Sequence, residues 1–149
     1  MALNEIALYY RVFFLFIEPL SALFGAICAG LYPGRYLAMT EHLPSSIGIL
    51  PLGIHVSLRQ LANMYLLFTL NEALVLRVTT DQRVWRILLL NLAVADIGHL
   101  ISVAPLGAGI YYDFTRWNTM DWGNIPFVYL GLTSRFCFLM GYGVKSKRE

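Results

Sequence analysis

The sequence predicts an all-α protein: an integral membrane four-helix bundle formed by one domain over residues 1–149. Three observations lead to this expectation. Hydrophobic residues make up 58% of the chain, charged residues make up only 13%, and the mean hydropathy is +0.61. Soluble domains carry about 25% charged residues, so this chain has too few charges to cover a water-facing surface. The apolar residues also lie in four runs, each close to the length that crosses a bilayer.

Residues that break helices separate the four expected spans. The spans cover residues 6–31, 58–77, 84–110 and 125–144. The first is expected to end at Tyr32-Pro33-Gly34, and the second is short unless it extends back through Ile54. Residues 79–81 mark a tight second connection, and residues 111–123 form the third loop. The first span is too long for a signal peptide and contains Glu18, so we expect it to be retained.

Basic residues in the connections, at the span ends and in the tail predict the orientation, because cytosolic loops of membrane proteins are enriched in Lys and Arg. One side holds Arg77, Arg83, Arg86, Lys145, Lys147 and Arg148, and the other holds Arg35, Arg59 and Arg116. With an even number of spans, both termini are therefore expected in the cytosol. Lysines at the third and fifth positions from the end resemble the dilysine retrieval signal of endoplasmic-reticulum membrane proteins. A plain positive-inside anchor is the alternative interpretation of these lysines.

The composition argues against several classes of function. Too few charges are present for a soluble enzyme or a disordered regulator, and a net charge of +2 is too small for nucleic-acid binding. Cys28 and Cys137 lie in apolar runs and match neither a disulfide framework nor a metal pattern. His42 and His55 lie in the first loop, far along the chain from His99. We therefore expect neither a metal nor a cofactor.

Among the ionisable residues inside the expected spans, five are singled out, because a charge at the bilayer centre costs about 2.5–3.5 kcal/mol. They are Glu18, Glu72, Asp96, His99 and Arg135. Because of this cost, we expect them to face one another or a wet cavity. Asp96 and His99 are three residues apart and share a helix face. Pro19 frees a backbone carbonyl one turn before it, which we expect neighbours or water to satisfy.

These five residues are the candidate catalytic groups. Three carboxyl groups cannot all ionise beside one guanidinium, because desolvation and mutual repulsion favour the neutral acid, so at least one is expected to be protonated at neutral pH. A carboxylic acid beside a carboxylate is the basis of general acid–base catalysis. The alternative is that polar groups only hold helices together, and for His99 alone a helix–helix hydrogen bond is the simpler interpretation. Five such groups in four helices favour a site.

Candidate substrate-binding residues lie in the second span and the third loop. In the second span, Tyr65 and Glu72 belong to one polar stripe, and Asn63 and Asn71 belong to a neighbouring stripe. The end of the third loop is dense in aromatic and amide groups that could cap the bundle and contact substrate. The candidates there are Trp117, Asp121, Trp122 and Asn124. An interfacial aromatic anchor with a helix N-cap is the alternative.

Five short motifs carry a resemblance to a known family. They are Phe14–Pro19, Gln60–Tyr65, Asn71–Ala73, Val94–His99 and Met120–Asn124. Together they resemble a family of small fungal four-span membrane proteins over nearly the whole chain. Some members look similar to the membrane hydrolase-cyclases of fungal polyene polyketide pathways of the aurovertin and citreoviridin type. More distantly, the layout is similar to the emopamil-binding-protein superfamily, with its membrane-buried carboxylates, lipophilic ligand and endoplasmic-reticulum location.

The resemblance implies an enzyme that opens epoxides made by a partner flavin monooxygenase. Opening an epoxide needs an acid to protonate the leaving oxygen and a base to activate water or an internal hydroxyl. Limonene-type epoxide hydrolases use an Asp–Arg–Asp set for this task on a different fold, so the parallel is one of chemistry only. The equivalent set here is expected to be Glu72, Arg135 and Asp96. Glu18 is then a second acid or an orienting group, and His99 orients Asp96.

Three hypotheses about function follow. In the first, an epoxide hydrolase or cyclase acts on a lipophilic polyketide or terpenoid, Tyr65 and Asn71 hold the substrate oxygen, and loss of Glu72 or Asp96 abolishes turnover without unfolding. In the second, an isomerase or terpene cyclase protonates an alkene, and aromatic rings stabilise the carbocation. In the third, the protein binds lipid or sterol without catalysis. A transporter is less favoured, because the sequence shows no inverted repeat.

Overall fold

The computed structural model describes residues 6–44 and 47–144, and this part of the chain is helical. The helices are α1 (Leu8–Val12), the π-helical η2 (Phe13–Ile17), α2 (Glu18–Leu31), α3 (Pro33–Thr40), α4 (Leu52–Leu70), the π-helical η3 (Asn71–Val75), α5 (Leu76–Val78), α6 (Gln82–Ser102), the 3-10 helices η4 (Ala104–Leu106) and η5 (Ala108–Tyr111), α7 (Thr119–Asn124) and α8 (Pro126–Leu139). The all-α prediction is confirmed for the described residues, which contain no strand beyond an isolated bridge between Ile6 and Val144.

Three continuous helical segments are long and apolar enough to cross a membrane. They are Leu8–Leu31 (α1, η2 and α2, the first rod), Leu52–Val78 (α4, η3 and α5, the second rod) and Gln82–Leu106 (α6 with η4). Large apolar side chains such as Leu20, Ile87 and Val94 are exposed, as expected for helices that contact lipid. The expectation of a membrane protein is therefore confirmed at the level of these three helices.

The fourth expected span is not confirmed. α8 has 14 residues and is about 21 Å long, whereas the hydrocarbon core of a bilayer is about 30 Å thick. It ends at Leu139 rather than at residue 144, because Gly141 and Gly143 adopt left-handed backbone conformations with φ of 89° and 68°.

Two further boundaries differ from the sequence-based expectation. The second rod begins at Leu52 rather than at residue 58, so it does extend back through Ile54. The regular part of α6 ends at Ser102 rather than at residue 110, because Pro105 and Gly107 (φ 95°) impose short 3-10 turns. A short helix, α3, also lies within the expected first loop.

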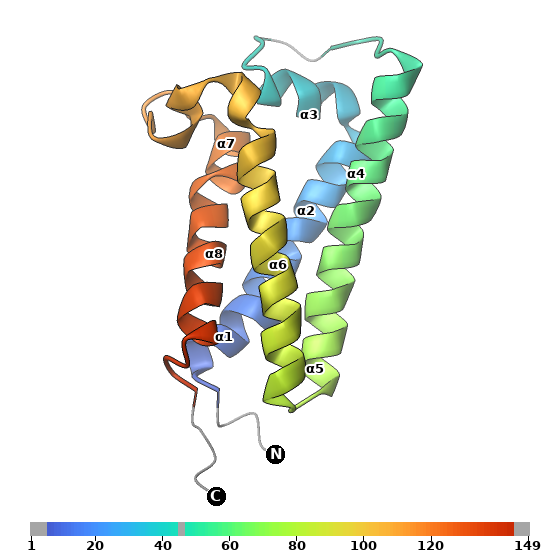
Figure 1. Cartoon of the computed structure of the whole chain (residues 1–149). Coiled ribbons are helices and arrows are strands. Elements are labelled where there is room, and N and C mark those ends of the chain that lie inside the picture. The colour runs from blue at the N-terminus through green and yellow to red at the C-terminus, as the bar shows by residue number, and fades with distance from the viewer. Residues whose placement is uncertain (1–5, 45–46, 145–149) are drawn as a thin grey trace, which may run out of the picture.

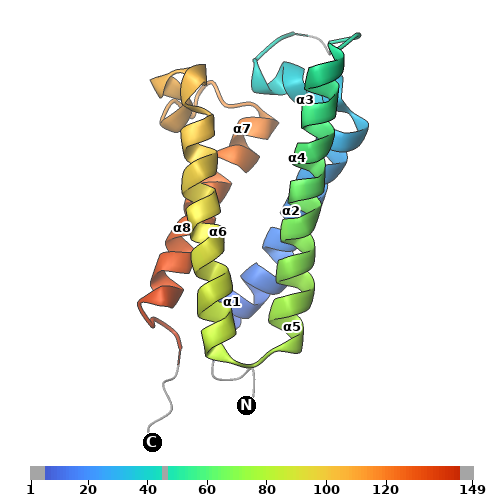
Figure 2. The ribbon, with the colours of Figure 1, turned by 45° about the vertical axis from the view of Figure 1, so that its right-hand side comes forward.

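The helices pack as two pairs, with α2 along α4 and α6 along α8. The two pairs stand on opposite sides of the bundle (Figure 2). The chain runs along the bundle four times, and α3 and α7 lie at one end of it (Figure 1). The first and last described residues lie together at the opposite end, where the Ala7 N–H donates to the Gly143 carbonyl at 2.9 Å. The C-terminal lysines lie outside the described residues.

A hydrophobic core, largely of aromatic side chains, joins the two rods, α6 and α8 at the end away from α3 and α7. Phe14 of the first rod, Leu76 of the second, Trp85 of α6 and Phe138 of α8 are each fully buried there. Trp85 stacks on Phe138 with ring centroids 5.8 Å apart. This end is therefore held by close apolar packing.

Pro19 behaves as the sequence predicts. Because Pro19 has no N–H, the carbonyl of Leu15 loses its helical partner, and Nη2 of Arg77 donates to it at 2.9 Å. The carbonyl of Pro19 in turn accepts from the Thr69 hydroxyl at 3.2 Å. The backbone beside Glu18 is thereby tied to the second rod.

Candidate functional site

Arg135 of α8 is the centre of the candidate site, with only 2% of its surface exposed. One turn earlier on the same helix lies Gly131. A Cβ at that position would lie 2.7 Å from Nη1 of Arg135 and 3.2 Å from Oε1 of Glu18, so a side chain there would displace the guanidinium from its present position. The ring of Phe14 lies 5.7 Å from the guanidinium carbon on another side. Arg135 is therefore held inside the bundle rather than directed to solvent.

Three carboxyl groups from three different helical segments surround this guanidinium. Nη1 donates to Oδ2 of Asp96 at 2.5 Å, and Nη2 donates to Oε1 of Glu72 at 3.2 Å. Nη2 also donates to Oε1 of Glu18. The structure thus brings together four of the five ionisable residues that the sequence singles out. Charge-assisted bonds of this kind are among the strongest side-chain interactions in proteins.

Two π-helical segments position two of these carboxyl groups. η2 ends directly before Glu18, and η3 contains Glu72, and the two segments contact each other. A π-helical turn widens the helix and changes the direction of the side chains that follow, and such turns are frequent at functional sites. Both interruptions therefore occur where a carboxylate has to be aimed at Arg135.

A cavity of about 500 Å³ opens on the carboxylate cluster. Its walls come from both helix pairs, and apolar side chains such as Phe68, Leu92 and Phe127 supply most of its lining. At the cavity, the side chains of Glu18 and Asp96 are 13% and 15% exposed, whereas that of Glu72 is 1% exposed. All three carboxyl groups line the cavity, and Glu18 and Asp96 are more exposed there than Glu72.

Glu18 presents a second oxygen that Arg135 does not use. Its Oε2 is buried and has no hydrogen-bond partner among the described residues. The same holds within that part of the chain for Nε of Arg135. Oε2 of Glu18 is thus a buried acceptor, and Nε of Arg135 a buried donor, without a hydrogen-bond partner in the described part of the chain. No group of three histidine, cysteine or carboxylate side chains in residues 6–44 and 47–144 has a geometry that could hold a metal ion.

Comparison with known proteins assigns the chain to a family. A family model described as a domain of unknown function (DUF7704) matches residues 3–145. The chain belongs to the DUF7704 family. No curated protein and no solved structure matches it.

Three more of the expected site residues line the cavity of this DUF7704 domain. They are Tyr65, His99 and Asn124. The His99 ring bonds through Nε2 to the carbonyl of Asn124 at 3.1 Å. This contact joins α6 to the end of α7, which corresponds to the helix–helix interpretation of His99. Within the described residues no hydrogen bond joins His99 to Asp96, so the structure does not show the orienting bond that the sequence led us to expect.

The other expected substrate-binding residues lie away from the cavity. Asn63 is exposed and Asn71 is half-buried, and neither lines the cavity wall. Successive residues on a helix are rotated by about 100°, so the stripe that carries Asn63 and Asn71 turns away when Tyr65 and Glu72 face inward. Only the stripe with Tyr65 and Glu72 therefore lines the cavity.

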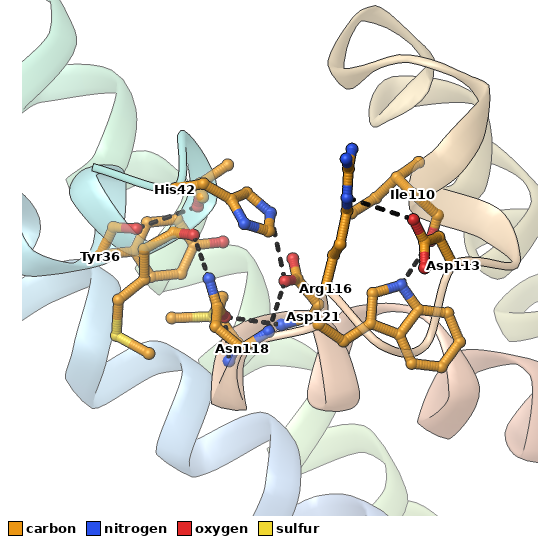
Figure 3. Close-up of polar contacts among 11 residues, drawn as sticks. Tyr36, His42, Ile110, Asp113, Arg116, Asn118 and Asp121 are labelled. Carbon is orange, nitrogen blue, oxygen red and sulfur yellow. Dashed lines mark hydrogen bonds and ion pairs between the residues drawn. The ribbon is translucent and has the colours of Figure 1, made fainter. Parts of the chain in front are cut away.

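The remaining loop candidates, Trp117, Asp121 and Trp122, belong to a cap that joins α3 to α7. Figure 3 shows the polar contacts of this cap. Asp121 and Asn118 form a capping box at the start of α7, and His42 pairs through Nε2 with Oδ2 of Asp121 at 3.2 Å. Nδ2 of Asn118 donates to the carbonyl of Met39 at 2.6 Å. Asp121 is buried in these contacts, so the N-cap interpretation holds for it. Met39 lines the cavity, and the α3–α7 cap therefore covers its outer end.

Trp117 and Trp122 belong to the same cap and do not line the cavity. Their rings pack edge to face, with centroids 5.2 Å apart, and Nε1 of Trp117 donates to the carbonyl of Ile110 at 2.9 Å. More than half of the Trp122 surface is exposed. Both residues therefore support the cap rather than contact a ligand in the cavity.

Tyr36 is a cavity residue that sequence analysis missed. It lies on α3, is buried, and its hydroxyl lies 3.3 Å from that of Tyr65. Burial, with the Tyr65 hydroxyl beside it, raises the pKa of Tyr36 well above its usual range, so the hydroxyl stays protonated. No sequence signal could have found it, because α3 was expected to be loop.

Replacing Asn118 with Ala is expected to lower the free energy of unfolding by about 1 kcal/mol, the usual cost of losing an N-cap. The variant removes the bonds to Met120 and Asp121 and the bond to the Met39 carbonyl. Thermal unfolding in detergent measures the change. Thr115→Ala, an exposed change in the preceding loop, is the matched control, and an unchanged melting temperature for Asn118→Ala contradicts the assigned role of the cap.

Proposed function

We propose that this chain is a membrane-embedded acid–base enzyme that opens an epoxide on a lipophilic polyketide or terpenoid. The reaction proceeds by hydrolysis or by formation of a cyclic ether. One observation carries the proposal: three carboxyl groups surround Arg135 at one end of a largely apolar cavity of about 500 Å³. A cavity of this size and lining suits a lipophilic small molecule.

Charge balance supports an acid beside a base. If all three carboxyl groups were ionised, the cluster would carry a net charge of −2 in a region that excludes water. Such an arrangement is costly, and bound protons relieve it. One guanidinium balances one carboxylate, so the neutral cluster holds protonated carboxyl groups next to an ionised one. This is the combination that epoxide opening needs.

The exposure of the carboxyl groups assigns their roles. Glu18 of the first rod and Asp96 of α6 face the cavity, and they form the acid–base pair. Glu72 is the most buried of the three and acts as a positioning residue that holds Arg135. The sequence predicted Glu72, Arg135 and Asp96 as the counterpart of the Asp–Arg–Asp set. The geometry favours Glu18 rather than Glu72 as the second carboxyl group of that set.

The proposed reaction balances within this pair. The protonated carboxyl group gives its proton to the epoxide oxygen as one C–O bond breaks. The ionised carboxylate takes a proton from water, or from a hydroxyl of the substrate, as that oxygen bonds to the carbon. The product is a diol or a cyclic ether, and the pair has exchanged one proton. Arg135 stabilises whichever carboxyl group is ionised.

The setting that we propose follows from the resemblance and from the basic residues. The enzyme acts in the endoplasmic-reticulum membrane with both termini in the cytosol, and α8 completes the bundle as its fourth membrane helix. Its substrate enters from the bilayer, and a flavin monooxygenase supplies the epoxide.

An isotope experiment tests this proposal. Microsomes that contain the protein are incubated with a lipophilic polyene bis-epoxide in water enriched in oxygen-18. We expect opening that depends on the protein and is lost in Asp96→Asn and Glu18→Gln, with Glu72→Gln compared in parallel. Label in the product indicates hydrolysis, and an unlabelled cyclic ether indicates internal attack. Wild-type protein that opens none of a panel of such epoxides contradicts the proposal.

One observation favours a second candidate, an isomerase or terpene cyclase that protonates an alkene. Phe68 and Phe127 line the same cavity as Glu18 and Asp96, and aromatic faces stabilise carbocations. This candidate requires conversion of an epoxide-free terpenoid or sterol. Saturable binding of such a molecule without any product instead identifies a lipid-binding protein.

A further inference from the structure

The cavity extends from the carboxylate cluster to the α3–α7 cap, and its length indicates the shape of its ligand. One face of α2 lines it from Glu18 to Tyr32, a distance of about 20 Å at the rise of an α-helix. A mainly apolar cavity that extends this far along one helix suits an extended hydrocarbon chain.

The outer end of the cavity carries a cation without a counterion. Arg35 of α3 lines this end, and no described residue forms an ion pair or a hydrogen bond with its guanidinium. The carboxyl groups that line the cavity lie at the other end, around Arg135. By contrast, Arg116 in the nearby third loop pairs with Asp113 at 3.3 Å. Arg35 is therefore available to an anion at the cavity mouth.

The hydroxyl groups of Tyr36 and Tyr65 lie between the two ends. The Tyr65 ring packs against Gly25, half-way along the lining face of α2, where a Cβ would lie 3.4 Å from the ring. With Ser21, His99 and Asn124, the hydroxyl pair gives the mainly apolar lining polar positions along its length. A ligand that fills the cavity thus passes from a cation, past a hydroxyl pair, to an acid cluster.

We infer that the ligand is a linear lipophilic acid whose anionic head group pairs with Arg35. Its far end, about 20 Å away at the rise of α2, lies at the carboxylate cluster. The guanidinium of Arg35 binds a carboxylate or a phosphate through paired N–H donors. The inference deepens the proposed function, on which it rests for the reaction: the group to be opened lies toward the end of the chain opposite the acid.

The test is a binding measurement that needs no turnover. Protein in nanodiscs of zwitterionic lipid is loaded with the fluorescent polyene cis-parinaric acid, which palmitate, hexadecyl phosphate and methyl palmitate then displace. We expect one or both anions to bind at least about tenfold more tightly than the ester, as a charge-assisted bond provides. A preference for only one of them identifies a carboxylate or a phosphate as the head group.

Substitutions locate the head group. Arg35→Gln is expected to reduce the affinity for the anions to that for the ester, and Arg35→Lys is expected to keep part of the preference. Arg59→Gln is the matched control, because Arg59 is exposed on α4 and does not line the cavity. Equal binding of anion and ester by the wild type, or a preference that survives in Arg35→Gln, overturns the inference.

The result is distinguishable from failure of the proposed function. Anion binding through Arg35 without the opening of any epoxide supports this inference and contradicts the proposed reaction. Opening of neutral epoxides without any preference for anionic chains supports the reaction and overturns the inference. With both in place, a linear acid with an epoxide near its far end is opened faster than one with an epoxide beside the carboxylate.

Discussion

Replacing Asp96 with Asn is expected to lower the rate of epoxide opening by at least about a hundredfold, the usual contribution of a general acid or base. Asparagine keeps the shape of the side chain and an oxygen that can accept from Nη1 of Arg135. It cannot exchange a proton with the substrate, so chemistry is lost while the contact between α6 and α8 is retained. The measurement is kcat for a lipophilic epoxide with reconstituted protein, together with the melting temperature.

Glu18→Gln is expected to show the same loss, because Glu18 faces the cavity from the opposite helix pair. Glu72→Gln is expected to lower kcat less, because Glu72 is the most buried of the three carboxyl groups and acts through Arg135. Asn91→Ala, an exposed change on α6, is the control that leaves kcat unchanged. If Asp96→Asn keeps the wild-type rate, or if Glu72→Gln alone abolishes it, the assignment of the pair is wrong.

Replacing Arg135 with Gln is expected to destabilise the fold by about 3–5 kcal/mol and to abolish turnover. The substitution leaves three carboxyl groups inside the bundle without a cation. The expected signature is a large decrease in melting temperature in detergent, and this decrease should become smaller as the pH falls and the carboxyl groups take up protons. Arg83→Gln, at the exposed start of α6, is the control that changes the melting temperature little.

A double substitution separates charge from packing. In Arg135→Gln combined with Glu72→Gln, one buried charge is removed with its partner, and part of the lost stability is expected to return. Arg135→Lys keeps the charge but cannot present the two nitrogens that contact Asp96 and the glutamates, so turnover is expected to stay low. A melting temperature that is unchanged in Arg135→Gln contradicts the view that the carboxyl groups depend on Arg135.

Several features of this protein could be predicted from single residues. The low charge content and the long apolar runs predict membrane-spanning helices, since a water-facing surface cannot be built from them. Pro19 lacks an N–H in a segment that excludes water, so the carbonyl of Leu15 had to find a partner outside its helix. Convergence of Glu18, Glu72 and Asp96 on Arg135 follows from the high cost of an unpaired charge in lipid.

Other features depend on contacts between helices and could not be predicted locally. His99 is three residues from Asp96 on one helix face, yet its ring bonds to the carbonyl of Asn124, because α8 begins beside it. The sequence predicts a polar loop residue at Asp121, but the segment that follows α3 packs against it and supplies His42. Sequence periodicity describes one helix at a time and carries no information about which element covers it.

The sequence by itself determined that the chain is helical and membrane-embedded, and that its buried charges must meet. These conclusions follow from the free-energy cost of placing charged and unpaired polar groups in hydrocarbon. This cost depends on the type of residue and not on its tertiary contacts. The tertiary structure alone decided which polar stripe of the second rod faces inward, that Glu18 and Asp96 are more exposed at the cavity than Glu72, and that Arg35 lines its outer end. The rotation of each helix and the two π-helical turns set these directions, and both result from packing between rods rather than from local sequence.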